Sequence, residues 1–164
     1  MKNINLENLR KGWTTGACAT AAAKAAYISL LTGKFLKSIK ITLPKGQEPD
    51  FEINSLKHGK NFVRASIIKD AGDDPDVTHG AEISVTVKKG LLGKGIIFKA
   101  GKGVGTITKS GLQLKIGEPA INPVPRNMIR EAIIKTAKKF NHSGDVIITI
   151  SVANGEELAK KTWN

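Results

Sequence analysis

The segment from Thr15 to Leu31 constrains the fold most strongly, because it consists almost entirely of residues that favour helices. Thr14 or Thr15 is suited to the N-cap position, and Gly33 stands where a helix commonly ends. Alanine and other small side chains also let a helix backbone lie close to a sheet. The sequence therefore predicts a helix over residues 15–31 that packs against strands.

Alternating apolar and β-branched residues predict strands over 36–43, 51–57, 61–69 and 81–88, separated by turns at 44–46 and 58–59. Residues 90–117 are rich in glycine and too irregular for a long strand, which indicates a backbone that runs close to something else. Pro125 is suited to the first turn of a second helix ending near Phe140, and 145–152 has the pattern of a buried strand. This order predicts an α+β fold with two main helices and an antiparallel or mixed sheet, for which the second domain of ribosomal protein S5 is a candidate likeness.

The length of 164 residues predicts one domain over 1–152. Asn154 and Glu157 have capping-box spacing, so we expect residues 153–164 to start a linker or a further helix that is cut short. No apolar run approaches the roughly 20 residues of a membrane-spanning helix, and the N-terminus has no apolar signal segment. A single cysteine and three histidines leave little for a zinc site. We expect a cytoplasmic protein with neither a metal site nor a membrane partner.

The net charge of +12, from 26 basic and 14 acidic residues, favours an anionic partner. A basic nucleic-acid-binding module is one interpretation of this charge. However, aromatic residues make up only 5% of the chain, and no basic stretch is interleaved with aromatics for base stacking. A small polycarboxylate or polyphosphate explains the charge equally well, and we expect no nucleic-acid partner.

Five segments, taken in order, resemble the cobalt-precorrin-5B C1-methyltransferase family of anaerobic cobalamin biosynthesis. They are 9–19 (LRKGWTTGACA), 69–80 (KDAGDDPDVTHG), 103–112 (GVGTITKSGL), 117–126 (GEPAINPVPR) and 150–159 (ISVANGEELA). Two departures are Ser110 and Ala153, which stand where proline is expected. Members of this family usually continue into a glycine-rich second half, so the resemblance implies that this chain is the N-terminal part and that the C-terminal domain is absent.

The resemblance implies methyl transfer from S-adenosylmethionine to carbon 1 of cobalt-precorrin-5B, giving cobalt-precorrin-6A. This substrate is a cobalt-bound ring with acetate and propionate arms. A strongly basic protein suits such a polyanion, because Arg and Lys pair with carboxylates and raise the encounter rate. Holding the ring carbon and the methyl donor in line supplies most of the catalysis, and the reaction leaves open whether a base removes a proton from the ring.

The acidic loop after residue 69 supplies the candidates for that proton transfer, which are Asp70, Asp76 and His79. Neighbouring carboxylates raise one another's pKa, as an active-site base requires. The alternative is that these aspartates cap turns beside Gly72 and Pro75. We also place Asp73, Asp74 and Thr78 of this loop among the substrate-binding residues.

Three further segments are candidates for substrate binding. Thr14, Thr15 and Gly16 start a helix, where free N–H groups and the helix dipole suit a carboxylate, although an ordinary N-cap is the alternative. The glycine loop with Lys102, Gly103 and Gly105 can cradle an anion in its amides. Asn122 and Arg126 flank the proline-rich arm, and Arg126 is suited to clamp a carboxylate. Cys18 is expected to be a small buried side chain.

Overall fold

The computed structural model describes residues 12–72, 79–105 and 119–153. Along the chain, its helices and strands are α1 (Thr15–Thr32), β1 (Ser38–Lys40), β2 (Asp50–Glu52), β3 (Ser55–Gly59), β4 (Phe62–Ile68), β5 (Glu82–Lys89), β6 (Ile96–Ala100), α2 (Pro123–Lys139) and β7 (Val146–Val152). The predicted α+β fold with two main helices and a mixed sheet is confirmed. The helix expected to begin at Asn154 lies outside the described residues.

The first helix forms where its alanine-rich sequence predicts it. Thr14 is the N-cap, and its side-chain oxygen accepts a hydrogen bond from the N–H of Ala17 at 3.0 Å. Gly33 ends the helix with a φ of 72°, in the left-handed region that favours glycine. Most of the alanines between these ends are completely buried, because α1 packs directly against β4, β5 and α2.

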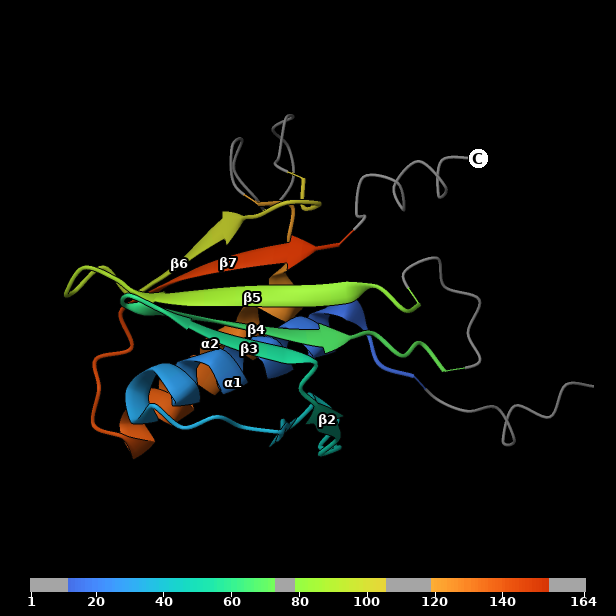
Figure 1. Ribbon diagram of the computed structural model, residues 1–164, viewed down its shortest axis with the longest axis horizontal. Helices are drawn as coiled ribbons and strands as arrows, with labels where there is room; N and C mark the ends of the chain where they lie inside the picture. Colours follow the sequence, from blue (N-terminus) through green and yellow to red (C-terminus); the bar gives the residue numbers. More distant parts are fainter. Residues whose placement is uncertain (1–11, 73–78, 106–118, 154–164) are drawn as a thin grey trace, which may run out of the picture.

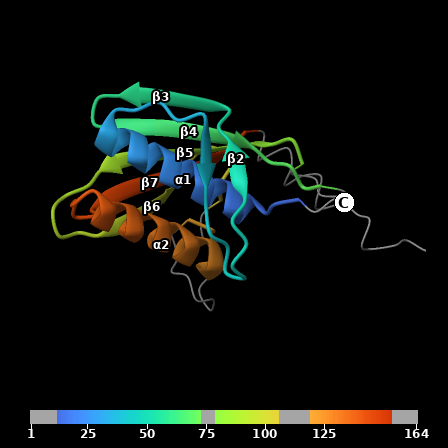
Figure 2. The same ribbon diagram turned by 90° about the horizontal axis from the view of Figure 1, so that it is seen from below.

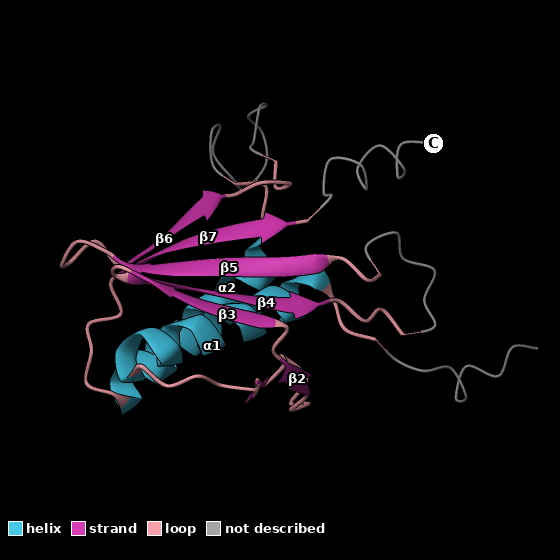
Figure 3. Ribbon diagram, viewed as in Figure 1, coloured by secondary structure: helices cyan, strands magenta, loops and turns pink. Residues whose placement is uncertain are grey.

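The main sheet has five strands in the order β3-β4-β5-β7-β6. All neighbouring strands are antiparallel except β6 and β7, which are parallel. Strands β1 and β2 form a separate two-stranded sheet. Both helices lie against the same face of the main sheet (Figures 1 and 2), and Figure 3 shows how the strands fan out above them. Among residues 12–72, 79–105 and 119–153, helices therefore cover only one side of the sheet.

Alternation along the three central strands produces the core. The helix-facing positions of β4, β5 and β7 are buried and apolar, whereas the opposite face carries polar and charged residues such as Arg64, Thr86 and Thr149. These three residues are aligned across β4, β5 and β7 by the strand register. The buried positions of the central strands are Val63, Ala65, Ile67, Ile83, Val85, Val87, Val146, Ile148 and Ile150.

The second helix begins two residues earlier than the sequence predicts, at Pro123 rather than Pro125. Both prolines stand in the first turn, where their missing N–H groups have no intrahelical acceptor to lose. The start of α2 touches the start of α1, because a side-chain carbon added at Gly16 would lie 3.0 Å from Pro125 Cγ. The two helix N-termini therefore meet at one end of the molecule. None of the helices within the described ranges has the length and apolarity needed to cross a membrane.

Candidate functional site

A cavity of about 720 Å³ opens where the starts of α1 and α2 meet the end of β7. Its volume falls in the range of about 300–1,000 Å³ typical of ligand sites. The structure brings together six of the residues predicted to bind substrate, from three separate segments, in the wall of this cavity: Thr14, Thr15, Gly16, Gly103, Gly105 and Asn122. Apolar side chains complete the wall, including Trp13, Val124, Met128 and Val152.

The start of α1 presents polar backbone groups to this cavity. The first N–H groups of a helix have no intrahelical acceptor. The Thr14 side chain satisfies that of Ala17, whereas those of Thr15 and Gly16 have no acceptor in the described part of the chain. Both residues line the cavity, so their amides are available to a bound molecule there, next to the positive end of the helix dipole.

Lys69 is the feature of this cavity that the sequence analysis missed. Only 4% of its surface is exposed, and Nζ donates a hydrogen bond to Thr15 Oγ1 at 3.0 Å. This bond places a buried basic group beside the N-terminus of α1, in a cavity wall that is mostly apolar. A signal for it was present, because Lys69 continues the alternation of the buried positions Val63, Ala65 and Ile67 in β4.

Asn122 contributes an unusual N-cap to the same cavity. It occupies the N-cap position of α2 with φ −61° and ψ 156°, yet its side chain makes no capping hydrogen bond. The side chain is exposed and lines the cavity instead. Its amide can therefore donate to, or accept from, a bound molecule without loss of a helix cap.

Arg126 and Lys102 lie elsewhere. Arg126 Nε donates to the carbonyl of Ile121 at 2.8 Å, and its Nη2 donates to the carbonyl of Pro119 at 2.7 Å. The guanidinium group also lies over the Phe98 ring, 5.3 Å from the ring centroid. It thus holds the arm that leads into α2 and is absent from the cavity lining, as is the exposed Lys102. The binding of a carboxylate by Arg126, which the sequence suggests, stays a prediction.

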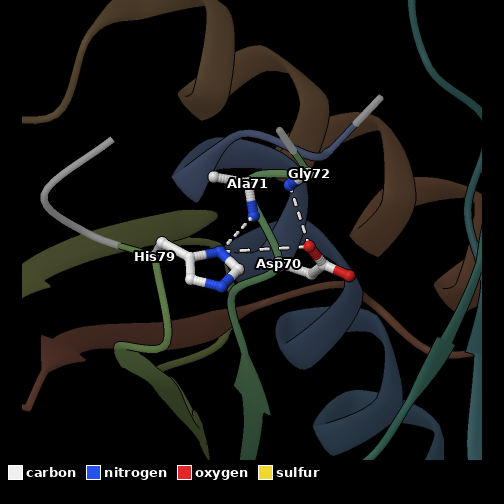
Figure 4. A network of polar contacts seen from close by, with 4 residues as sticks. All are labelled: Asp70, Ala71, Gly72 and His79. Carbon is white, nitrogen blue, oxygen red and sulfur yellow. Dashed lines mark hydrogen bonds and ion pairs between the residues drawn. The ribbon is translucent and has the colours of Figure 1, made fainter. Parts of the chain in front are cut away.

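Asp70 and His79 form a small polar network at the two ends of the acidic loop (Figure 4). Asp70 Oδ1 accepts the N–H of Gly72 at 2.8 Å, so this carboxylate caps a turn, as the alternative interpretation held. His79 Nδ1 accepts the N–H of Ala71 at 3.0 Å and lies 3.9 Å from Asp70 Oδ1. Because Nδ1 is an acceptor, the ring proton lies on Nε2, and proton uptake at Nδ1 requires loss of the Ala71 bond. The remaining residues predicted in this loop, Asp73, Asp74, Asp76 and Thr78, lie outside the described residues.

Trp13 lines both the main cavity and a second, acidic hollow of about 430 Å³. Asp70 lines this second hollow together with Asp50 and Glu52, and is not part of the main cavity. The Trp13 ring packs against Phe51, with ring centroids 6.1 Å apart. No group of three or more His, Cys, Asp or Glu side chains in the described part of the chain is arranged to hold a metal ion.

Cys18 lies one turn into α1 and is buried. Burial raises the pKa of its thiol to about 11, and the positive charge of nearby Lys69 offsets this effect only in part. The thiol is therefore protonated at neutral pH and is a poor nucleophile. This agrees with the prediction that Cys18 is a small buried side chain.

Comparison with known proteins identifies the family to which the chain belongs. The CbiD family model matches residues 2–164. This chain belongs to the CbiD family. Over 163 residues it is 54% identical to a cobalt-precorrin-5B C(1)-methyltransferase of Brucella anthropi. The aligned region covers 99% of this chain and 44% of that protein. A protein of the same name from Paramagnetospirillum magneticum is 53% identical over 156 residues, which cover 95% of this chain and 44% of that protein.

A solved structure of this CbiD family is similar in fold. The cobalamin biosynthesis protein cbiD from Archaeoglobus fulgidus superimposes with a TM-score of 0.68 and 37% identity, over 94% of this chain and 47% of that one. The comparisons do not bear on the likeness to ribosomal protein S5. The chain spans less than half the length of the curated relatives it matches.

Proposed function

We propose that this chain forms the corrinoid-binding part of a cobalt-precorrin-5B C1-methyltransferase. The whole enzyme would transfer a methyl group from S-adenosylmethionine to carbon 1 of cobalt-precorrin-5B and release cobalt-precorrin-6A. Family membership and the names of relatives more than 50% identical support this reaction. The observation that carries the assignment to this part of the protein is the cavity, into which three motif segments converge around the buried Lys69.

The cavity has the chemistry to hold one edge of a ring that carries carboxylate arms. Lys69, the Thr15 hydroxyl and the amides of Thr15 and Gly16 supply positive charge and hydrogen-bond donors at one point. Apolar side chains such as Val124 and Met128 supply a surface for the hydrocarbon part of the ring. One carboxylate arm at Lys69 would fix the orientation of carbon 1 relative to the methyl donor.

The catalytic contribution of these residues is positioning. Methyl transfer is an in-line displacement, so the rate depends on holding the ring carbon and the sulfonium methyl group in one line. If a proton must leave the ring, Asp70, Asp76 and His79 stay our candidates for accepting it. The Ala71 bond keeps His79 Nδ1 occupied, so His79 would have to release that amide first.

The same proposal includes S-adenosylmethionine as the methyl donor and a polycarboxylate cobalt-corrinoid as the partner. It also includes a cytoplasmic location. The net charge of +12 suits a polyanionic substrate. The cobalt ion in this reaction is part of the substrate.

Calorimetric titration with a corrinoid polycarboxylate tests this function. We expect saturable binding that survives moderate salt, because contacts in a partly dry cavity are screened less than surface charges. Lys69→Met should weaken binding about tenfold or more, the cost of losing a charge-assisted hydrogen bond. Lys60→Met removes the same charge from an exposed turn and serves as the matched control.

Equal binding by wild type and Lys69→Met, with both proteins folded by circular dichroism, would contradict the assignment of the cavity. Binding to random oligonucleotides with a steep salt dependence would instead support the nucleic-acid interpretation of the charge.

A further inference from the structure

The loop between β5 and β6 lies at the end of the sheet opposite the one at which β7 ends (Figure 1), and it carries two adjacent exposed leucines. The exposed fractions of Leu91 and Leu92 are 73% and 87%. The cavity lies at the opposite end, where Val152 pairs with Ile83 at the start of β5. This leucine loop, residues 90–95, is thus remote from the proposed substrate site.

The leucine loop is held in place by Asp145, which immediately precedes β7. One carboxylate oxygen of Asp145 accepts the N–H of Gly93 at 2.9 Å, and the other accepts that of Gly95 at 2.8 Å. The Asp145 carbonyl also accepts the N–H of Gly90 at 2.9 Å. Three bonds to one residue fix the base of the loop, so the two leucines are presented to solvent by an anchored backbone rather than by a chain that could fold them inward.

Lysines surround this tip. Lys88 and Lys89 precede the loop and Lys94 lies within it, while Lys60 lies in the adjacent β3–β4 turn, whose Asn61 carbonyl accepts the N–H of Lys89. All four are exposed, and within the described ranges none forms an ion pair with an acid. The Asp145 carboxylate is engaged with the loop amides. This end of the sheet therefore combines an exposed apolar tip with the positive charges of four lysines.

We propose that the leucine loop docks on an anionic membrane surface, with Leu91 and Leu92 inserted among the lipid headgroups and the surrounding lysines paired with anionic lipids. Apolar insertion combined with basic residues is the general design of proteins that bind a membrane surface without spanning it. Two exposed leucines supply only a small part of the roughly 800 Å² of accessible surface that each partner buries in a stable protein interface. A fluid lipid surface can accommodate a protruding tip without a matching hollow. This mode of binding needs no membrane-spanning helix, so it is compatible with a chain that has no apolar run of the roughly 20 residues such a helix requires.

Vesicle co-sedimentation of the full chain tests the proposal, with phosphatidylcholine vesicles containing roughly one-third phosphatidylglycerol compared with phosphatidylcholine alone. We expect binding to the anionic vesicles that declines with salt. The double variant Leu91→Ser/Leu92→Ser should bind about tenfold or more weakly, because it loses the inserted apolar surface. Ile134→Ser is the matched control, since Ile134 is 48% exposed on α2.

Charge is tested separately from insertion. Lys88→Gln/Lys89→Gln/Lys94→Gln should bind the anionic vesicles more weakly than Lys37→Gln/Lys40→Gln/Lys45→Gln, which removes the same charge from exposed positions around β1. No binding to anionic vesicles, or equal binding by the leucine double variant and the Ile134 control, would overturn the proposal. Polyglutamate that binds as tightly as the vesicles, independently of the leucines, would point instead to an acidic protein partner and also overturn it.

Discussion

The two helices begin side by side at the same cavity, but their N-termini are stabilised in different ways. The start of α1 is closed by its own N-cap, since Thr14 accepts the N–H of Ala17. The start of α2 is instead fixed by prolines and by Arg126, which binds the carbonyls of the preceding arm. Asn122 is consequently free of a capping bond and faces the cavity. The comparison indicates which polar groups at this site are structural and which are available to a ligand.

Replacing Arg126 should have the largest effect on stability. Arg126→Ala removes two charge-assisted hydrogen bonds to the carbonyls of Pro119 and Ile121, and should lower the free energy of unfolding by about 2–3 kcal/mol. Arg130→Ala is the control, because Arg130 also lies over the Phe98 ring, at 5.2 Å, and should cost only about 0.5–1 kcal/mol. Urea denaturation measures both. Equal losses of stability in the two variants would show that Arg126 does not hold the arm, and that the start of α2 is not stabilised in the way described above.

Removing the N-cap of α1 should have an intermediate effect. Thr14→Ala leaves the N–H of Ala17 without its acceptor and should cost about 1 kcal/mol in urea denaturation. Thr14→Ser keeps a hydroxyl at the cap and should restore most of that stability. If the serine variant is as unstable as the alanine variant, the Thr14 side chain acts through its methyl group and not as a cap.

The smallest effect on stability is expected at Asn122. Asn122→Ala should change the free energy of unfolding by less than about 0.5 kcal/mol, because no capping bond is lost. The same variant should bind a corrinoid polycarboxylate about fivefold more weakly, the cost of one neutral hydrogen bond. A stability loss as large as that of Thr14→Ala would mean that Asn122 is an ordinary cap, and the contrast between the two helix starts would disappear.

Local signals in the sequence were sufficient for α1. Its Thr14 cap and its Gly33 terminator act within a few residues, so both ends of the helix are correctly placed apart from one residue. The strand predicted over 51–57 is divided in the structure into β2 and β3. Asn54 lies between them, and its side-chain amide donates to Ser66 Oγ and Glu82 Oε2, on β4 and β5. Those partners are distant in sequence, so the break was not visible in the alternation.

Strand β6 was missed for a related reason. It lies in the glycine-rich segment 90–117, where short apolar pairs gave no regular pattern. Residues Ile96–Ala100 become a strand because they pair in parallel with β7, some fifty positions later in the chain. Pairing between such distant segments depends on the tertiary fold and leaves little trace in local propensity.

In the candidate site, too, local sequence signals identified individual residues, whereas their arrangement depends on contacts between distant segments. The motif residues Thr15, Gly103 and Asn122 were identified from three segments, but only the fold shows that they share one cavity. Lys69 was missed because a lysine at the end of a strand usually lies in solvent. Its alternation with the buried residues of β4 was a better guide than its charge. The proposed roles of Asp70 and His79 stay predictions, with the turn contacts of both now defined.

The central claim is that the cavity between the two helix starts binds the corrinoid. Amide chemical shifts of the 15N-labelled chain, titrated with a diamagnetic cobalt(III) corrinoid polycarboxylate, test it most directly. We predict the largest changes at Gly16, Gly103 and Gly105 in the cavity wall, and little change at Gly93 and Gly95 in the leucine loop. Changes confined to Asp50, Glu52 and Asp70 around the acidic hollow, or none at all in a folded chain, would contradict the account.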